Sequence, residues 1–220
     1  DAAWHGAFGT EAAVEALVSP PHLVVFAGLA FLLTSPVVVL WRRPTVRLNW
    51  AATVVVTVSV VSTVLVTSLF TGFLSPLAGG MSLQTSYVEP LVGESLNDYD
   101  QVRGLGIAVW TSALLAAAFT LVLVRFRLRP GALVVAFSLI GVPGLVVEGE
   151  GIGPLVAGFV ATGLVVEVAV AVLARPVLGR LGAAITGALT GSVLWATTFV
   201  LLEADDRLGW TEALWGGTIT

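Results

Sequence analysis

The stretch that decides the fold lies at residues 21–73 and reads PHLVVFAGLAFLLTSPVVVLWRRPTVRLNWAATVVVTVSVVSTVLVTSLFTGF. It holds two apolar runs, Pro21–Trp41 and Asn49–Phe73, with three arginines in the short segment between them. A helix that crosses a bilayer needs about 20 mostly apolar residues, and each run reaches that length. The stretch therefore predicts two transmembrane helices joined by a short, positively charged connection.

The rest of the chain repeats this pattern. Four further apolar runs follow, at Val102–Val124, Gly131–Val147, Ile152–Ala174 and Leu181–Leu202. The fourth run of the chain is short for a membrane span and contains Pro143. We expect an all-α, polytopic transmembrane helix bundle of about six spans, forming a single domain over residues 1–220. A short outer interfacial helix is expected within 1–20, the spans within 21–202, and an outer segment at 203–220 that leads toward a further helix of a longer protein.

The composition supports a membrane protein. Hydrophobic residues make up 57% of the 220 residues and charged residues only 11%, whereas soluble domains have about 25% charged residues. The chain has no cysteine, which excludes disulfides, iron–sulfur clusters and thiolate metal sites. Its basic residues form no cluster on a soluble face, so we expect no nucleic-acid partner. The expected partners are the lipid bilayer and other membrane subunits or further copies of this chain.

The charged residues predict the orientation of the bundle. Arginines follow the first, third and fifth runs, so that with six spans all of these clusters lie on one side: Arg42, Arg43, Arg47, Arg125, Arg127, Arg129, Arg175 and Arg180. Excess arginine marks the cytoplasmic side of a membrane protein. The acidic residues fall on the other side, apart from Glu167 within the fifth run. We therefore expect a multi-pass protein of the cell membrane with residues 1–20 on the extracellular or periplasmic face.

Both histidines of the chain lie in this outer segment, in DAAWH at residues 1–5 and SPPH at residues 19–22. Asp1 and His5 are four residues apart, which on a helix places them on one face. Prolines are tolerated in the first turn of a helix, so His22 is expected in the first turn of the first span, with Ser19 as its N-cap. Two imidazoles and a carboxylate suit zinc, copper or iron.

The residues around the two histidines are compatible with a metal site and also with an ordinary membrane interface. Glu11 can serve as a fourth ligand or as a hydrogen-bond partner of a ligand. Thr10 is expected to be the N-cap of a short helix that begins at Glu11. Against a metal site, histidines and acids are common at membrane interfaces, and Trp4 beside His5 is typical of an aromatic belt.

The stretches DAAWH and SPPHLVVF resemble the C subunit of the copper membrane monooxygenases, the particulate methane and ammonia monooxygenase family. The resemblance implies a copper site with Asp1, His5 and His22 as ligands, framed by Trp4, Ser19 and Pro20, with Glu11 matching an intervening acid. The family has 12 residues between its two histidines, whereas this chain has 16, Gly6 to Pro21. Four residues are about one helical turn. The same stretches also resemble a broader set of uncharacterised multi-span membrane proteins.

Several functions follow as hypotheses. The first is a copper-dependent oxidoreductase subunit of the monooxygenase kind, working beside partner subunits. The second is a non-enzymatic protein for metal delivery, sensing or transport, and the third is a scaffold whose histidines are incidental. Glu167 is either an intramembrane proton or ion relay or a partner of Arg175. The sequence GALTG at Gly187–Gly191 predicts close helix packing rather than a site.

Overall fold

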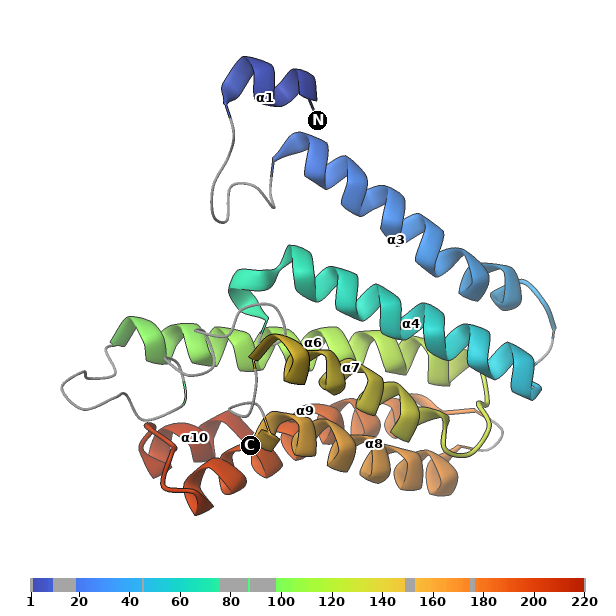
Figure 1. Cartoon of the computed structure of the whole chain (residues 1–220). Coiled ribbons are helices and arrows are strands. Elements are labelled where there is room, and N and C mark those ends of the chain that lie inside the picture. The colour runs from blue at the N-terminus through green and yellow to red at the C-terminus, as the bar shows by residue number, and fades with distance from the viewer. Residues whose placement is uncertain are drawn as a thin grey trace.

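The computed structural model describes residues 2–9, 19–44, 46–75, 87, 98–148, 153–174 and 177–219. Over these ranges the chain is helical and contains no strand, and its elements pack lengthwise beside one another (Figure 1). The helices are α1 (Ala2–Phe8), α3 (Pro20–Trp41), α4 (Trp50–Phe70), the 3-10 turn η1 (Gly72–Leu74), α6 (Asp98–Arg125), α7 (Ala132–Glu148), α8 (Gly153–Leu173), α9 (Arg180–Ala204) and α10 (Glu212–Ile219).

The long helices coincide with the predicted apolar runs. Among the described residues, five helices are long and apolar enough to cross a membrane, namely α3, α4, α6, α8 and α9. The run expected to form the fourth span forms α7, which has 17 residues and contains Pro143. At about 1.5 Å per residue α7 is roughly 25 Å long, shorter than the roughly 30 Å hydrocarbon core. The all-helical prediction is confirmed.

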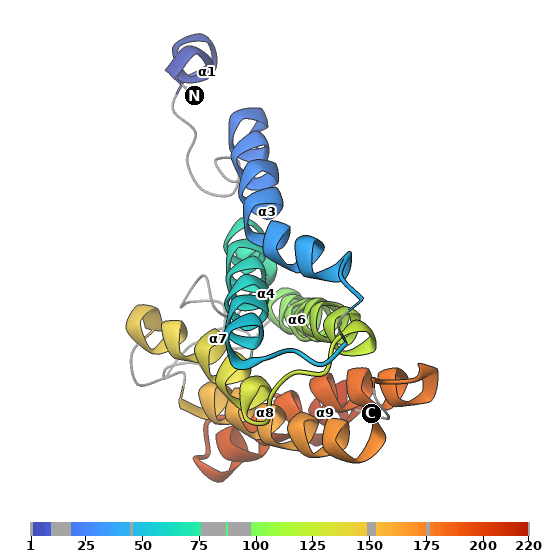
Figure 2. The ribbon, with the colours of Figure 1, turned by 90° about the vertical axis from the view of Figure 1, so that its right-hand side faces the viewer.

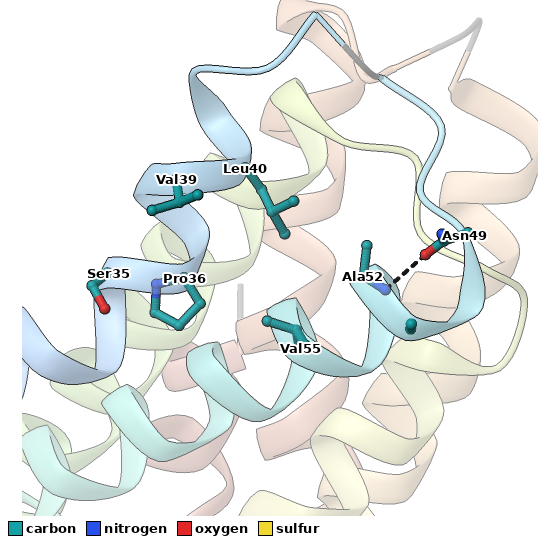
Figure 3. Close-up of a pocket in the computed structure, with 8 residues that line it drawn as sticks. Ser35, Pro36, Val39, Leu40, Asn49, Ala52 and Val55 are labelled. Atoms are coloured by element: carbon teal, nitrogen blue, oxygen red, sulfur yellow. Dashed lines mark hydrogen bonds between the residues drawn. The ribbon is translucent and has the colours of Figure 1, made fainter.

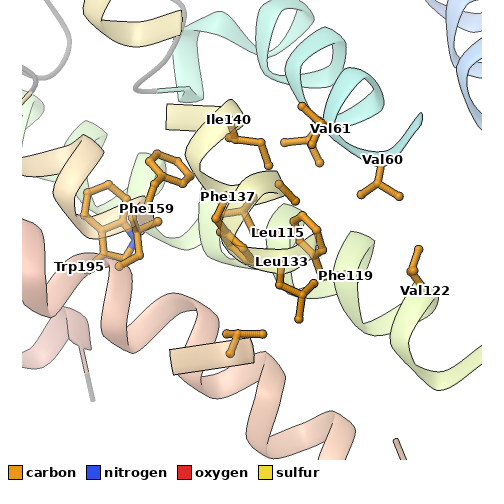
Figure 4. Packing of buried hydrophobic residues seen from close by; sticks show 14 of the residues in the cluster. Val60, Val61, Leu115, Phe119, Val122, Leu133, Phe137, Ile140, Phe159 and Trp195 are labelled. Atoms are coloured by element: carbon orange, nitrogen blue, oxygen red, sulfur yellow. The ribbon is translucent and has the colours of Figure 1, made fainter. Parts of the chain in front are cut away.

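The core of the bundle lies among α4, α6, α7, α8 and α9 (Figure 4). α7 packs between α4 and α8, and α9 packs against both α6 and α8. At the centre, the rings of Phe119 and Phe137 stack with centroids 4.5 Å apart. Trp195 of α9 is almost wholly buried, and its Nε1–H donates to Ala108 O at 3.2 Å and Ser112 Oγ at 3.1 Å. These contacts tie α6 to α9.

Glycines allow the helices of the core to approach closely. A Cβ atom added at Gly158 of α8 would lie 2.5 Å from Thr198 Oγ1 and 2.7 Å from Leu194 O on α9. A Cβ at Gly191 would lie 2.8 Å from Ser112 Oγ, and one at Gly187 would meet Ala116 of α6. The prediction that GALTG serves helix packing is confirmed.

α3 lies at the edge of the bundle and packs on α4 (Figures 1 and 2). All of its 22 residues are described, and none of them is buried. Figure 2 shows α3 bending along its length, and Pro36 lies inside it. A proline within a helix removes one backbone N–H and bends the helix. The Ser35 hydroxyl donates to Leu32 O at 2.8 Å, the carbonyl whose partner proline removes, and Ser59 of α4 donates to Leu33 O.

Most of the described arginines lie at one end of the bundle, and we call it the arginine end. Here Arg125 at the end of α6 donates from Nε and Nη2 to Trp41 O at 3.3 and 3.0 Å and from Nη2 to Arg43 O, which satisfies carbonyls at the end of α3. Arg47 and Arg127 form a parallel β-bridge, and Leu178 N–H donates to Leu123 O at 3.3 Å. The connections after α3, α6 and α8 therefore meet at one end, as the arginine pattern predicted.

The opposite end is closed by an aromatic cluster around Tyr87. This side chain is fully buried, and its ring lies 4.8 Å from Trp210, 5.4 Å from Trp195 and 5.4 Å from Phe199 by centroid. The Tyr87 hydroxyl donates to Gly104 O, and Tyr87 O accepts Gly209 N–H at 2.7 Å. Burial raises the pKa of the Tyr87 phenol well above its ordinary value of 10, and a backbone hydrogen bond with Ala108 opposes the rise.

Candidate metal centre

The candidate site lies where α1 meets the beginning of α3, away from the arginine end (Figure 1). α3 begins with prolines in its first two positions, and Ser19 occupies the N-cap position with extended backbone angles. His22 therefore lies in the first turn of the helix, as predicted. The predicted cap itself differs, because the Ser19 side chain makes no capping bond to the backbone.

The Ser19 hydroxyl lies instead 2.8 Å from His22 Nδ1. Ser19 is 5% exposed, so this contact fixes the ring of His22 from a buried position. A hydroxyl can donate or accept, and the contact therefore permits either tautomer of His22. In the tautomer whose Nδ1–H donates to Ser19, the lone pair lies on Nε2. Ser19 was predicted as the N-cap of this helix, and its contact with His22 was not predicted, although the spacing of three residues places the two side chains on one turn.

His5 is positioned by the end of α1. Gly9 N–H donates to His5 O at 3.0 Å, and Gly9 has a φ of +85°, a conformation that glycine adopts without strain. The turn brings Gly9 O to 3.2 Å from His5 Nδ1. A carbonyl only accepts, so Nδ1 is the protonated nitrogen of the neutral ring and Nε2 carries its lone pair. Gly9 was not among the residues that the sequence singled out.

The structure brings the two histidines together across 16 intervening residues. Their ring centroids are 6.4 Å apart, and the ring planes are inclined at 57°. Both side chains are partly exposed. The predicted acids Asp1 and Glu11, and the predicted cap Thr10, lie outside the described residues. Of the predicted ligands, the described part of the chain thus contains the two imidazoles.

The arrangement fits a metal ion in its donor chemistry. With metal–nitrogen bonds of about 2.0–2.1 Å, two imidazoles on one ion hold their centroids roughly 4.5–6.5 Å apart, so 6.4 Å lies at the wide end. To bind one tetrahedral ion, the two imidazole rings would have to move about 1 Å closer to each other. Metal-bound histidines usually donate their other ring N–H to a carbonyl or a similar acceptor, as His5 does to Gly9 O. Among the described residues, no group of three or more His, Cys, Asp or Glu side chains is placed to hold a metal.

Glu167 lies far along α8 and has a different local role. Its Oε2 accepts the backbone N–H of Leu133 at 3.0 Å, in the first turn of α7. A carboxylate there satisfies an N–H that has no partner within its own helix and complements the positive end of the helix dipole. Neither predicted role included this contact. Arg175, its proposed partner, lies outside the described residues.

Comparisons of the chain with protein-family models, with curated proteins and with solved structures found no match. Over the described ranges, the chain is an all-helical bundle with five helices long and apolar enough to span a membrane. The case for a particular function therefore comes from the two histidines and their surroundings.

Proposed function

We propose that this protein is a multi-pass membrane protein that binds a metal ion, copper foremost, through Asp1, His5 and His22. The single observation that supports the proposal is the pair of imidazoles with centroids 6.4 Å apart, from residues otherwise separated along the chain. The only two histidines of the chain form this pair. Zinc and iron accept the same ligand types, so the preference for copper rests on the resemblance of DAAWH and SPPHLVVF to the copper membrane monooxygenases.

The residues of the site have two roles, to bind the ion and to orient the residues that bind it. His5 and His22 bind through Nε2, while Gly9 O and Ser19 Oγ orient the rings through Nδ1. Asp1 supplies the negative charge, and Glu11 is a fourth ligand or a partner of one. Copper bound there would supply one-electron redox chemistry, the basis of a monooxygenase-like activity beside partner subunits. The helix end beneath the site is apolar, with Leu23, Val24 and Val25 exposed on α3.

Metal analysis by mass spectrometry tests the proposal on protein purified without a histidine tag and reloaded with copper or zinc. We expect near-stoichiometric copper that is lost in His5→Ala and in His22→Ala. Ser19→Ala should weaken binding about 10- to 100-fold, because it removes an orienting partner. The control Glu203→Gln removes an exposed acid of the same end and should retain the metal. Absence of metal from the reloaded parent, or full retention in His22→Ala, would contradict the proposal.

We further propose six spans, with α7 as the short fourth span, the arginine end in the cytoplasm and the histidine pair outside the cell membrane. The excess of arginine at one end supports this orientation. α7 packs between α4 and α8, both of which are long and apolar enough to cross a membrane.

The chain has no cysteine, so single cysteines report their side of the membrane without background. Gly153→Cys and Gly179→Cys place a side chain where a Cβ meets nothing within 4 Å, and Pro130→Cys lies at an exposed turn before α7. In intact cells an impermeant maleimide should label Gly153→Cys alone. Labelling of Pro130→Cys and Gly153→Cys from the same side would show that α7 does not cross.

A further inference from the structure

A groove separates α3 from α4 near the arginine end, at the opposite end of α3 from His22 (Figure 3). It has a volume of about 450 Å³ and is lined by Pro36, Val39 and Leu40 of α3 and by Ala52 and Val55 of α4. Pockets that take small molecules have volumes of about 300–1,000 Å³. The groove arises because α3 bends at Pro36 while α4 presents small alanine side chains to it.

A second hollow continues around α3 toward the arginines. It has a volume of about 220 Å³, shares Ser35 and Val39 with the first, and reaches Arg42. Phe31 and Val38 line its other part. Together, the two hollows form an apolar surface along α3 that ends at the guanidinium of Arg42.

The charge at that end is strongly positive. Arg42, Arg43 and Arg47 are exposed there, and Glu167, the acid of α8, accepts the backbone N–H of Leu133 at the start of α7. Asn49 at the mouth of the groove accepts Ala52 N–H at 2.8 Å with its Oδ1, so its amide nitrogen is a further donor at this place. Basic pockets between helices at a membrane surface bind the head groups of anionic lipids.

We propose that the groove between α3 and α4 holds an anionic phospholipid, with an acyl chain along Pro36, Val39 and Val55 and its phosphate at Arg42. A second copy of this chain fits the surface less well. Copies in one membrane share their orientation, so a two-fold contact here would bring the same arginines against one another. An acyl chain with a phosphate matches both the apolar lining and the charge.

The test uses the full chain in vesicles of equal parts phosphatidylglycerol and phosphatidylcholine, followed by native mass spectrometry of the lipids retained after release. We expect retained phosphatidylglycerol to exceed phosphatidylcholine. Arg42→Gln should lower its retention about fivefold, the effect of one basic residue near an anionic surface. Ala52→Leu should remove the retained lipid by filling the groove. Arg129→Gln, an exposed arginine of the same end that does not line the groove, and Val24→Leu on exposed α3 should change nothing.

Two results would overturn the proposal. Equal retention of both lipids, unchanged in Arg42→Gln, would mean that the groove does not recognise the charged head group. A dimer that dissociates in Ala52→Leu would mean that a second copy occupies the groove. Because Arg42 is exposed, Arg42→Gln keeps the test decisive if Ala52→Leu does not fold. Neither readout depends on metal at the histidine pair.

Discussion

α3 and α9 are both long apolar helices, yet they sit in the bundle in opposite ways. Among the described helices long enough to cross a membrane, α3 contains the apolar stretch of highest mean hydropathy, and α3 has no buried residue. The apolar stretch of α9 has the lowest mean hydropathy among these helices, and the buried residues of α9 are Gly182, Thr186, Thr190, Leu194, Trp195, Thr198, Phe199 and Leu202. In a bilayer, lipid is as apolar as leucine, so hydrophobicity does not bring helices together. Small and hydroxyl-bearing residues do, and α9 is rich in them.

The difference between α3 and α9 predicts that removing an aromatic side chain changes the free energy of unfolding far more in α9 than in α3. Trp195→Ala should lower the free energy of unfolding by about 3–5 kcal/mol, because it leaves a cavity between α6 and α9 and removes two hydrogen bonds. Phe31→Ala, on α3 at 79% exposure, should change it by less than about 0.5 kcal/mol. Thermal unfolding in detergent micelles measures both. A large loss for Phe31→Ala would show that α3 is packed against a protein partner under those conditions.

Glycines sharpen the same comparison. Gly158→Ala should destabilise by about 1–3 kcal/mol, since its Cβ would collide with the backbone of Leu194 as well as with Thr198. In Gly28→Ala the new Cβ meets nothing within 4 Å, and replacing a helical glycine should stabilise α3 by about 0.5–1 kcal/mol. Opposite signs in denaturant titrations are the expected result. Equal destabilisation would mean that the two helices are packed alike.

A smaller loss than those of Trp195→Ala and Gly158→Ala is expected in the aromatic cluster around Tyr87. Tyr87→Phe should cost about 1 kcal/mol at neutral pH through the lost bond to Gly104 O. Burial raises the pKa of Tyr87, so the folded chain keeps the phenolic proton at a pH where the unfolded chain, with a pKa of about 10, releases it. Stability should therefore fall as pH rises above about 10, and this fall should be smaller in Tyr87→Phe.

Tyr99→Phe is the matched control, because Tyr99 is 72% exposed. Its unfolding curve should follow that of the parent across the alkaline range. In this variant the ultraviolet absorbance of phenolate reports Tyr87 alone, since the chain has two tyrosines. An absorbance change at the ordinary pKa of tyrosine would show that Tyr87 is solvated.

Much of the fold follows from the sequence because helices in lipid must satisfy their own backbone. The length of each apolar run therefore predicts a helix closely, as Pro21–Trp41 does for α3. The arginine pattern likewise predicts which helix ends meet. The packing of α3 does not follow, since a helix that is apolar on all sides gives no sign of which side faces protein.

The candidate site was predictable only in its residue types. The two histidines were recognised as a pair, and the structure places them near each other, but their orientation depends on Ser19 and Gly9 O. Because every residue has a backbone carbonyl, a sequence pattern does not show which carbonyl will contact a histidine ring. Glu167 illustrates the same limit, because its contact is with a backbone N–H of α7.

The contact of Arg125 with the end of α3 has a consequence for synthesis of the chain. Arg125 follows Trp41 by 84 residues, and the ribosome adds about 5–20 residues per second. The carbonyls at the end of α3 are therefore synthesised about 4–17 s before the Arg125 side chain that donates to them. We expect α3 and α4 to pack on each other during this interval, before α6 supplies the contact of Arg125.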